Sequence, residues 1–169
     1  MPQKDNKGIK FLVTGGTIDG LDYNSKGKAP KLHKSLVPKF LKQSRITIPY
    51  KIEILMQKDS KFLTDKDRET IYQGCKNTKE DKIIITHGTM TMVGTAKYLA
   101  KKNLNKTIVL VGSGILGSDK DSDVLFNLGT AVMAASLLPK GVYVTMNGKA
   151  FYWNNVIKNI EKGIFTTID

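Results

Sequence analysis

Three short segments of the sequence place hydroxyl side chains next to glycines, a combination that could support a hydroxyl nucleophile and an oxyanion site. They read Thr14-Gly15-Gly16-Thr17, Thr86-His87-Gly88-Thr89 and Val111-Gly112-Ser113-Gly114. Glycine lets the backbone approach a ligand closely, and a threonine hydroxyl becomes a nucleophile when a base activates it. A desolvated lysine can be that base. Each segment alone is equally compatible with an ordinary turn, so only their combination indicates a site.

Each of these segments follows a short apolar run that is typical of a buried strand. Further strands and the helices between them alternate along the chain, with strands expected at 9–14, 50–56, 82–86, 107–112 and 142–146 and helices from Thr64 and at 91–102 and 122–138. This alternation predicts an α/β fold: a three-layer, Rossmann-like (flavodoxin-like), mostly parallel sheet with helices on both faces. Since parallel strands end at the same edge, the three segments should meet there.

Local signals define some elements better than others. Thr64 with Asp67 three residues later predicts a capping box at a helix start. Residues 32–43 show a helical pattern that Pro38 should kink or divide. Residues 21–31 are polar and rich in glycine and lysine, which predicts a mobile loop, and the tail 147–169 shows no clear periodicity.

The chain has 169 residues, of which 40% are hydrophobic and 25% charged, and this predicts one domain over residues 1–169. No apolar run is long enough to span a membrane, and the first residues lack the apolar core of a signal peptide. Cys75 is the single cysteine and there are two histidines, so a zinc site is not expected. We therefore expect a cytoplasmic protein with no membrane association and no metal.

The net charge of +12 is spread along the chain. All 27 basic residues except Arg45 and Arg68 are lysines, with no dense basic run. Nucleic-acid readers usually concentrate charge on one face and use arginine for bidentate contacts. A solvated, lysine-rich surface is the interpretation that we favour, with no specific binding of nucleic acid.

Four stretches resemble the bacterial-type L-asparaginase/glutaminase family. Residues 11–18 (FLVTGGTI) are similar to its first signature, and residues 85–92 (ITHGTMTM) to its second, which usually reads HGTDTM. Residues 122–135 resemble the helix after its third strand, and 144–147 the strand before its catalytic lysine. The resemblance covers nearly the whole chain but only the N-terminal domain of that family.

The resemblance implies a threonine nucleophile at Thr17, which attacks a side-chain carboxamide and releases ammonia. It also implies a second catalytic threonine at Thr89 that works with Lys158, and no organic cofactor. Gly16, Ser60, Lys61, Gly88 and Met90 fall on substrate-binding positions, and His87 is interpreted as packing the turn. A purely structural role for Thr17, Thr89 or Lys158 is the alternative. Thr17 and Thr89 should face each other across one pocket.

The departures from the family are informative. Met90 stands where the family has an aspartate that meets the substrate's amino group, and Lys61 and Phe62 replace polar or acidic residues. Relatives carry an assisting tyrosine near Lys28, for which Tyr23 is a nearby substitute. The C-terminal domain of the family, which completes a neighbouring subunit's site, is expected to be absent.

These changes predict an amidohydrolase that is weak or altered toward L-asparagine. Its small-molecule amide substrate should be anionic and should lack a free amine. The alternative is a degenerate binding or structural module without catalysis. We also expect a homo-oligomer, most simply a dimer. Phe151, Tyr152 and Trp153 could line its interface or equally pack at the sheet edge.

Overall fold

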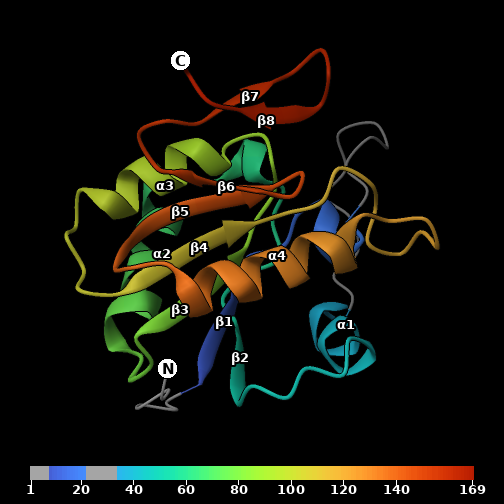
Figure 1. Cartoon of the computed structure of the whole chain (residues 1–169), viewed down its shortest axis with the longest axis horizontal. Helices are drawn as coiled ribbons and strands as arrows, with labels where there is room; N and C mark the ends of the chain where they lie inside the picture. The colour runs from blue at the N-terminus through green and yellow to red at the C-terminus, as the bar shows by residue number, and fades with distance from the viewer. Residues whose placement is uncertain (1–7, 22–33) are drawn as a thin grey trace.

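The fold is built on a six-stranded sheet, which a computed structural model describes for residues 8–21 and 34–169 (Figure 1). The strand order is β2-β1-β3-β4-β5-β6. The strands are β1 (Ile9–Val13), β2 (Tyr50–Ile54), β3 (Lys82–Thr86), β4 (Thr107–Val111), β5 (Gly141–Met146) and β6 (Lys149–Tyr152). β1 to β5 are parallel, and β6 pairs antiparallel with β5. The order 2-1-3-4-5 is that of flavodoxin-like sheets, so the predicted fold class is confirmed.

Helices cover both faces of this sheet (Figure 1). They are α1 (Val37–Gln43), α2 (Asp65–Asn77), α3 (Met92–Ala100) and α4 (Val124–Leu137), with short 3₁₀ turns at Thr17–Asp19 and Ser60–Phe62. Ile9, Phe11 and Val13 of β1 pack with α1 and α4 on one face, whereas Leu12 packs with α2 and α3 on the other. The central strands are therefore apolar on both sides, as buried parallel strands are.

Elements with strong local signals lie where they were predicted. β3 spans Lys82–Thr86, and α2 starts directly after Thr64. The Thr64 hydroxyl accepts a hydrogen bond from the Asp67 N–H, and the Asp67 carboxylate accepts one from the Thr64 N–H. This is the predicted capping box, and it satisfies two backbone groups around the helix start.

The helix predicted at 32–43 is not found at residues 34–36, and residues 32–33 lie outside the described ranges. α1 begins only at Val37, so Pro38 lies in the first turn and neither kinks nor divides the helix. A proline is tolerated there because the first N–H groups of a helix have no intrahelical partner. Most of the predicted loop at 21–31, including Tyr23 and Lys28, lies outside the described residues.

The tail contains three strands that the prediction missed. β6 follows β5 through Asn147 and Gly148, both at positive φ (55° and 75°). An Asn-Gly pair between strands is a strong hairpin signal, and it could have identified β6. Beyond it, β7 (Ile157–Asn159) and β8 (Ile164–Thr166) form a separate antiparallel hairpin. Within the described ranges, no helix is both long and apolar enough to cross a membrane.

Candidate active site

A cavity of about 260 Å³ lies at the carboxyl ends of β1 and β3, where the sequence motifs meet. Its walls are formed by Thr17, Leu21, Asp59, Ser60, Lys61, Gly88, Thr89, Met90, Gly114, Leu116 and Lys158. Every catalytic position predicted from the sequence is in this set, and Thr17 and Thr89 line the same cavity. Of the predicted substrate-binding positions, only Gly16 is outside it.

Gly16 instead brings two of the motifs together. A Cβ atom at this position would lie 2.6 Å from the backbone of Gly88, so the turns after β1 and β3 pack backbone against backbone. The φ of 86° and ψ of −176° of Gly16 also form a conformation that only glycine adopts readily. The glycine thus allows Thr17, the next residue, to lie close to the Gly88–Thr89 turn.

Asp19 anchors the turn that carries Thr17. Its side chain is fully buried and accepts hydrogen bonds from the Ser35 hydroxyl at 2.8 Å, the Leu36 N–H at 2.7 Å and the Gln57 amide at 3.1 Å. Sequence reasoning missed this role, because the donors come from two other parts of the chain. A buried carboxylate with three donors is well satisfied, and it holds the 3₁₀ turn in place.

Ser60 ties the segment between β2 and α2 to the segment after β3. Its hydroxyl accepts a hydrogen bond from the Thr91 N–H at 3.3 Å, and its carbonyl accepts one from the Thr91 hydroxyl at 2.8 Å. Asp59 caps this turn, since its carboxylate accepts the N–H of Lys61 at 2.9 Å. Phe62, which stands where the family has a polar or acidic residue, does not line the cavity and is 66% exposed.

Lys158 reaches the cavity from β7. Its ammonium group donates to Oγ1 of Thr89 at 2.8 Å and lies 3.3 Å from Sδ of Met90. Burial and the nearby charge of Lys61 lower the pKa of Lys158, and the carboxylate of Asp59 opposes this shift. A lysine with a lowered pKa is more readily neutral, and the neutral amine is the form that can act as a base.

The β7–β8 hairpin is attached to the core at two points. The Phe165 side chain is buried in the cluster under α2 and α3, and the Phe165 N–H donates to Oδ1 of Asn147 at 2.9 Å. Asn147 lies in the turn between β5 and β6, so the last residues of the main sheet hold the hairpin over the cavity. This places Lys158 beside Thr89.

His87 has a positioning role. Its ring is fully buried, with Nδ1 2.7 Å from the Gly88 carbonyl and Nε2 2.9 Å from the Thr95 hydroxyl. Burial lowers its pKa to about 4, so the ring is neutral near pH 7. Nδ1–H therefore donates to Gly88, and Nε2 accepts from Thr95. Both ring nitrogens are used in holding the turn.

The third glycine segment contributes backbone rather than a hydroxyl. Ser113 is buried and donates to the Ile115 carbonyl at 2.7 Å, so its hydroxyl does not face the cavity. Gly114 lines the cavity, and its N–H is bound by the Asp123 carboxylate at 2.9 Å. The third segment thus reaches the cavity through Gly114 and not through the Ser113 hydroxyl. Among the residues that the structure describes, no three His, Cys, Asp or Glu side chains gather to hold a metal.

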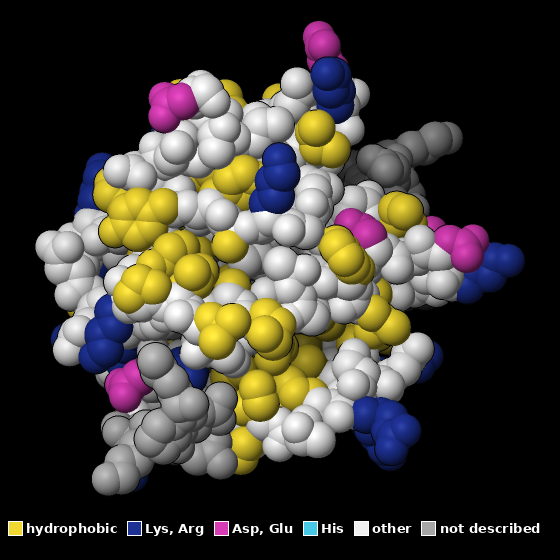
Figure 2. Space-filling view, viewed as in Figure 1, with side chains coloured by type: hydrophobic (Ala, Val, Ile, Leu, Met, Phe, Trp, Pro, Cys, Tyr) yellow, Lys and Arg dark blue, Asp and Glu magenta, His cyan; other side chains and the backbone are white. Residues whose placement is uncertain are grey.

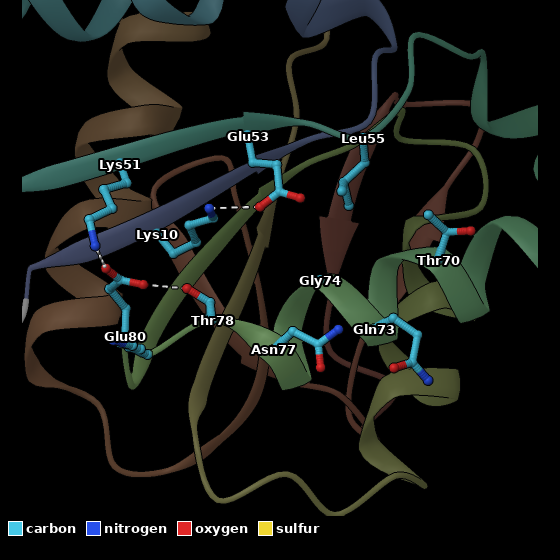
Figure 3. Close-up of a pocket in the computed structure, with 11 residues that line it drawn as sticks. Lys10, Lys51, Glu53, Leu55, Thr70, Gln73, Gly74, Asn77, Thr78 and Glu80 are labelled. Carbon is cyan, nitrogen blue, oxygen red and sulfur yellow. Dashed lines mark hydrogen bonds and ion pairs between the residues drawn. The ribbon is translucent and has the colours of Figure 1, made fainter.

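A larger hollow of about 510 Å³ lies elsewhere, between the edge strand β2 and helix α2 (Figure 3). Four of its charged side chains form two ion pairs, Lys10 with Glu53 at 2.7 Å and Lys51 with Glu80 at 2.8 Å, and Lys79 also lines it. The hydroxyl of Thr78 donates to Glu80. None of the residues that line this hollow pairs a hydroxyl with a lysine ammonium group, whereas the smaller cavity holds the Thr89–Lys158 contact.

Comparison with known proteins identifies relatives over nearly the whole chain. Residues 8–164 match the family model described as "Asparaginase, N-terminal". The chain is 32% identical to a subunit of the glutamyl-tRNA(Gln) amidotransferase of Methanococcus vannielii, over 94% of this chain and 38% of that protein. It is 31% identical to a probable periplasmic L-asparaginase of Haemophilus influenzae, over 96% of this chain and 49% of that protein.

A solved structure shows the same fold. The thermostable L-asparaginase from Thermococcus kodakarensis superimposes with a TM-score of 0.78 at 29% identity, over 95% of this chain and 51% of that one. The chain thus spans about half or less of the length of these relatives. The residues that match the family model, 8–164, include every residue of the cavity described above.

Proposed function

The chain belongs to the asparaginase family through that family's N-terminal domain, and from this premise we propose that it is an amidohydrolase with Thr17 as its nucleophile. The contact that carries the proposal is the 2.8 Å hydrogen bond between Lys158 and Thr89, in a cavity that Thr17 also lines. The Thr89 hydroxyl, bound to the Lys158 amine of lowered pKa, can take the proton of the attacking Thr17 hydroxyl and pass its own proton to that amine.

The proposed reaction has two halves. Thr17 Oγ1 attacks the carboxamide carbon, and its proton passes through Thr89 to the neutral amine of Lys158. The C–N bond then breaks, and the same proton leaves with the nitrogen as ammonia. In the second half, water attacks the acyl ester and one of its protons follows the same path back to Thr17. The carboxylic acid that is released then gives its remaining proton to ammonia or water and becomes a carboxylate.

The proposal is tested by ammonia release from a panel of carboxamides. The native protein should release ammonia, and Thr17→Ala, purified identically, should not. Thr130→Val and Lys162→Met are matched controls, because both residues lie outside the cavity, Thr130 on α4 and Lys162 between β7 and β8. If no amide yields ammonia with the folded protein, or if Thr17→Ala keeps the activity, the proposal fails.

Met90 favours a second candidate, a module that binds an amide without hydrolysing it. The thioether gives Lys158 a neutral neighbour where the family has an aspartate, and a thioether is only a weak hydrogen-bond acceptor. Calorimetry separates the two candidates. If an amide gives a heat of binding but is not hydrolysed, the binding module is favoured over the hydrolase.

The relatives named as amidotransferase subunits suggest a third candidate, in which the ammonia is transferred to an acceptor instead of being released. In that case, ammonia from the cavity would be passed to an acceptor on a partner protein. The native chain alone would then release ammonia slowly, and the rate would rise when the partner is added. The test adds the purified chain to a lysate of its own cells from which the native copies have been removed. An unchanged rate of ammonia release by the added chain would exclude such a partner.

We also propose that the protein forms a homodimer. Apolar side chains gather on the face that carries α4 (Figure 2), where Phe126, Met133 and Leu137 are each more than half exposed. Large apolar patches are seldom left to water. Of the aromatic residues that the sequence suggests for an interface, Phe151 is only 4% exposed and packs in the core, whereas Tyr152 is 45% exposed. A monomer in light scattering at high concentration would contradict the proposal.

A further inference from the structure

One exposed methionine has its sulfur beside a charged side chain. Met90 is 43% exposed, and its Sδ lies 3.3 Å from the ammonium nitrogen of Lys158. A thioether is a weak hydrogen-bond acceptor, so the stronger partner of Lys158 is Oγ1 of Thr89 at 2.8 Å. Because Met90 is exposed, a small oxidant from the solvent can reach its side chain.

Most other sulfur atoms of the described residues are protected from oxidation. Met92 and Met146 are buried. Burial also raises the pKa of the Cys75 thiol to about 12, so this cysteine is not a reactive thiolate near pH 7. Met133 on α4 is the other exposed methionine within the described ranges, at 56%, and it does not line the cavity. Met133 is therefore a natural reference for Met90.

The oxidation of a thioether by a peroxide moves protons, and Lys158 is placed to move them. A lone pair of Met90 Sδ attacks one oxygen of hydrogen peroxide, the O–O bond breaks, and the other oxygen leaves as hydroxide. The Lys158 ammonium group gives a proton to this hydroxide, which becomes water, and then takes the proton of the new S–OH group. The sulfur is thus oxidised to a sulfoxide, the peroxide is reduced to water, and Lys158 ends as it began.

A sulfoxide at Met90 would change the electrostatic surroundings of Lys158. Its oxygen is polar and accepts a hydrogen bond from an ammonium group far better than a thioether does. Such a bond favours the charged form of the lysine, and so opposes the burial and the Lys61 charge that lower its pKa. A lysine that stays charged cannot accept the proton of Thr89.

From these contacts we propose that Met90 is a reversible oxidation site, where a peroxide forms a sulfoxide that binds the Lys158 ammonium group and interrupts proton transfer from Thr89. Methionine sulfoxide reductases restore the thioether, with one enzyme for each epimer. The loss of ammonia release rests on the proposed hydrolysis, whereas the oxidation and its effect on Lys158 do not.

The first experiment measures the oxidation itself. The full chain is treated with graded hydrogen peroxide, and peptide mass spectrometry follows the gain of an oxygen atom at each methionine. Met90 should be oxidised roughly tenfold faster than Met133 or more, although Met133 is the more exposed, because Lys158 can transfer protons at Met90. Lys158→Leu should remove this advantage. Oxidation of Met90 no faster than that of Met133, or an advantage that survives in Lys158→Leu, would overturn the proposal.

The second experiment follows Lys158 without any substrate. A trace of acetic anhydride labels neutral amines, and Lys162, exposed between β7 and β8, is the internal reference. Peroxide should lower the labelling of Lys158 relative to Lys162 by roughly tenfold, which corresponds to about one unit of pKa, and the reductases should restore it. In Met90→Leu, peroxide should leave this ratio unchanged. An equal fall in Met90→Leu, or no fall in native protein with oxidised Met90, would overturn the proposal.

Ammonia release separates this proposal from the proposed hydrolysis, with each protein compared with its own untreated sample. Peroxide should slow the native protein and Met133→Leu alike, but not Met90→Leu. A fall in Lys158 labelling in a protein that releases no ammonia from any amide would support the oxidation site and overturn the hydrolysis. Undiminished ammonia release after complete oxidation of Met90 would support the hydrolysis and overturn the oxidation site as a control of it.

Discussion

The ammonium nitrogen of Lys158 lies 2.8 Å from Oγ1 of Thr89, although 69 positions separate the two residues. The contact joins two independent elements, because Thr89 follows β3 of the main sheet and Lys158 lies on β7 of a separate hairpin. If these two side chains relay one proton, they act as a unit, and removing either should remove the same function.

A double-mutant cycle tests this relationship. Thr89→Val and Lys158→Met should each slow ammonia release by roughly 10²- to 10⁴-fold, the usual contribution of a positioned acid–base group. The double variant should be about as slow as either single one. Effects that multiply would show that the two side chains act separately. Thr130→Val and Lys162→Met serve as the controls, since neither residue lines the cavity.

Asn147 should control the position of Lys158 from a distance. Its Oδ1 accepts the Phe165 N–H, and its φ of 55° suits asparagine, aspartate or glycine. Asn147→Gly keeps the turn but loses the acceptor, whereas Asn147→Asp keeps both. We expect Asn147→Gly to lower ammonia release by roughly tenfold or more, since misplaced catalytic groups are costly.

Hydrogen exchange provides the readout that activity alone does not. In Asn147→Gly, the amides of β7 and β8 should exchange faster while those of β3 and β4 stay protected. Asn147→Asp should resemble the native protein in both measurements. Equal behaviour of the two variants would show that the Phe165 contact does not hold the hairpin.

His87 should make the protein sensitive to mild acid. Burial lowers the pKa of its ring from 6.5 to about 4 in the folded state. Between these values the unfolded chain binds the proton more readily, so stability falls as pH drops from above 6.5 toward about 4. The loss amounts to about 3 kcal/mol by the usual conversion of a pKa shift.

Two measurements check this expectation. Denaturant unfolding of His87→Gln should show a loss between roughly pH 7.5 and pH 4.5 that is smaller than the native loss by about this amount. If that variant does not fold, NMR of the native imidazole gives the answer directly. A His87 ring that titrates at its ordinary value of 6.5 in the folded protein would refute the buried, neutral state.

Local signals in the sequence predict those elements whose causes are themselves local. The Thr64–Asp67 capping box fixes the start of α2, and the apolar run at 82–86 coincides with β3. Pro38 is misread because a proline pattern alone does not distinguish a kink from a first helical turn. The Asn147-Gly148 pair is a sequence signal for the hairpin that contains β6, but the tail shows no clear periodicity and periodicity alone therefore does not identify this strand.

The site is predictable only where the chain itself carries a signature. Thr17 and Thr89 follow strands within glycine motifs, so their meeting follows from the parallel sheet. Nothing local marks Lys158 among the many lysines, and only the family resemblance singles it out. The anchoring role of Asp19 cannot be predicted from the sequence, because its partners Ser35 and Gln57 come from distant positions in the chain.

Met90 gives the last prediction, which concerns pH. Ammonia release should rise with pH as Lys158 loses its proton and then level off, because the neutral amine is the base. Burial and Lys61 lower the pKa of Lys158, so this rise should occur below the usual range of a lysine.

Met90 Sδ lies 3.3 Å from the ammonium nitrogen of Lys158, so Met90→Asp would place a carboxylate beside it. An opposite charge favours the protonated form, so the rise should move to higher pH, whereas Met90→Leu should leave it in place. On the plateau, Met90→Asp should also raise the rate of L-asparagine hydrolysis relative to that of succinamate, which carries a carboxylate but no ammonium group. The new carboxylate can meet the ammonium group of L-asparagine. A rise that stays where it is in Met90→Asp would mean that Lys158 is not the group that titrates.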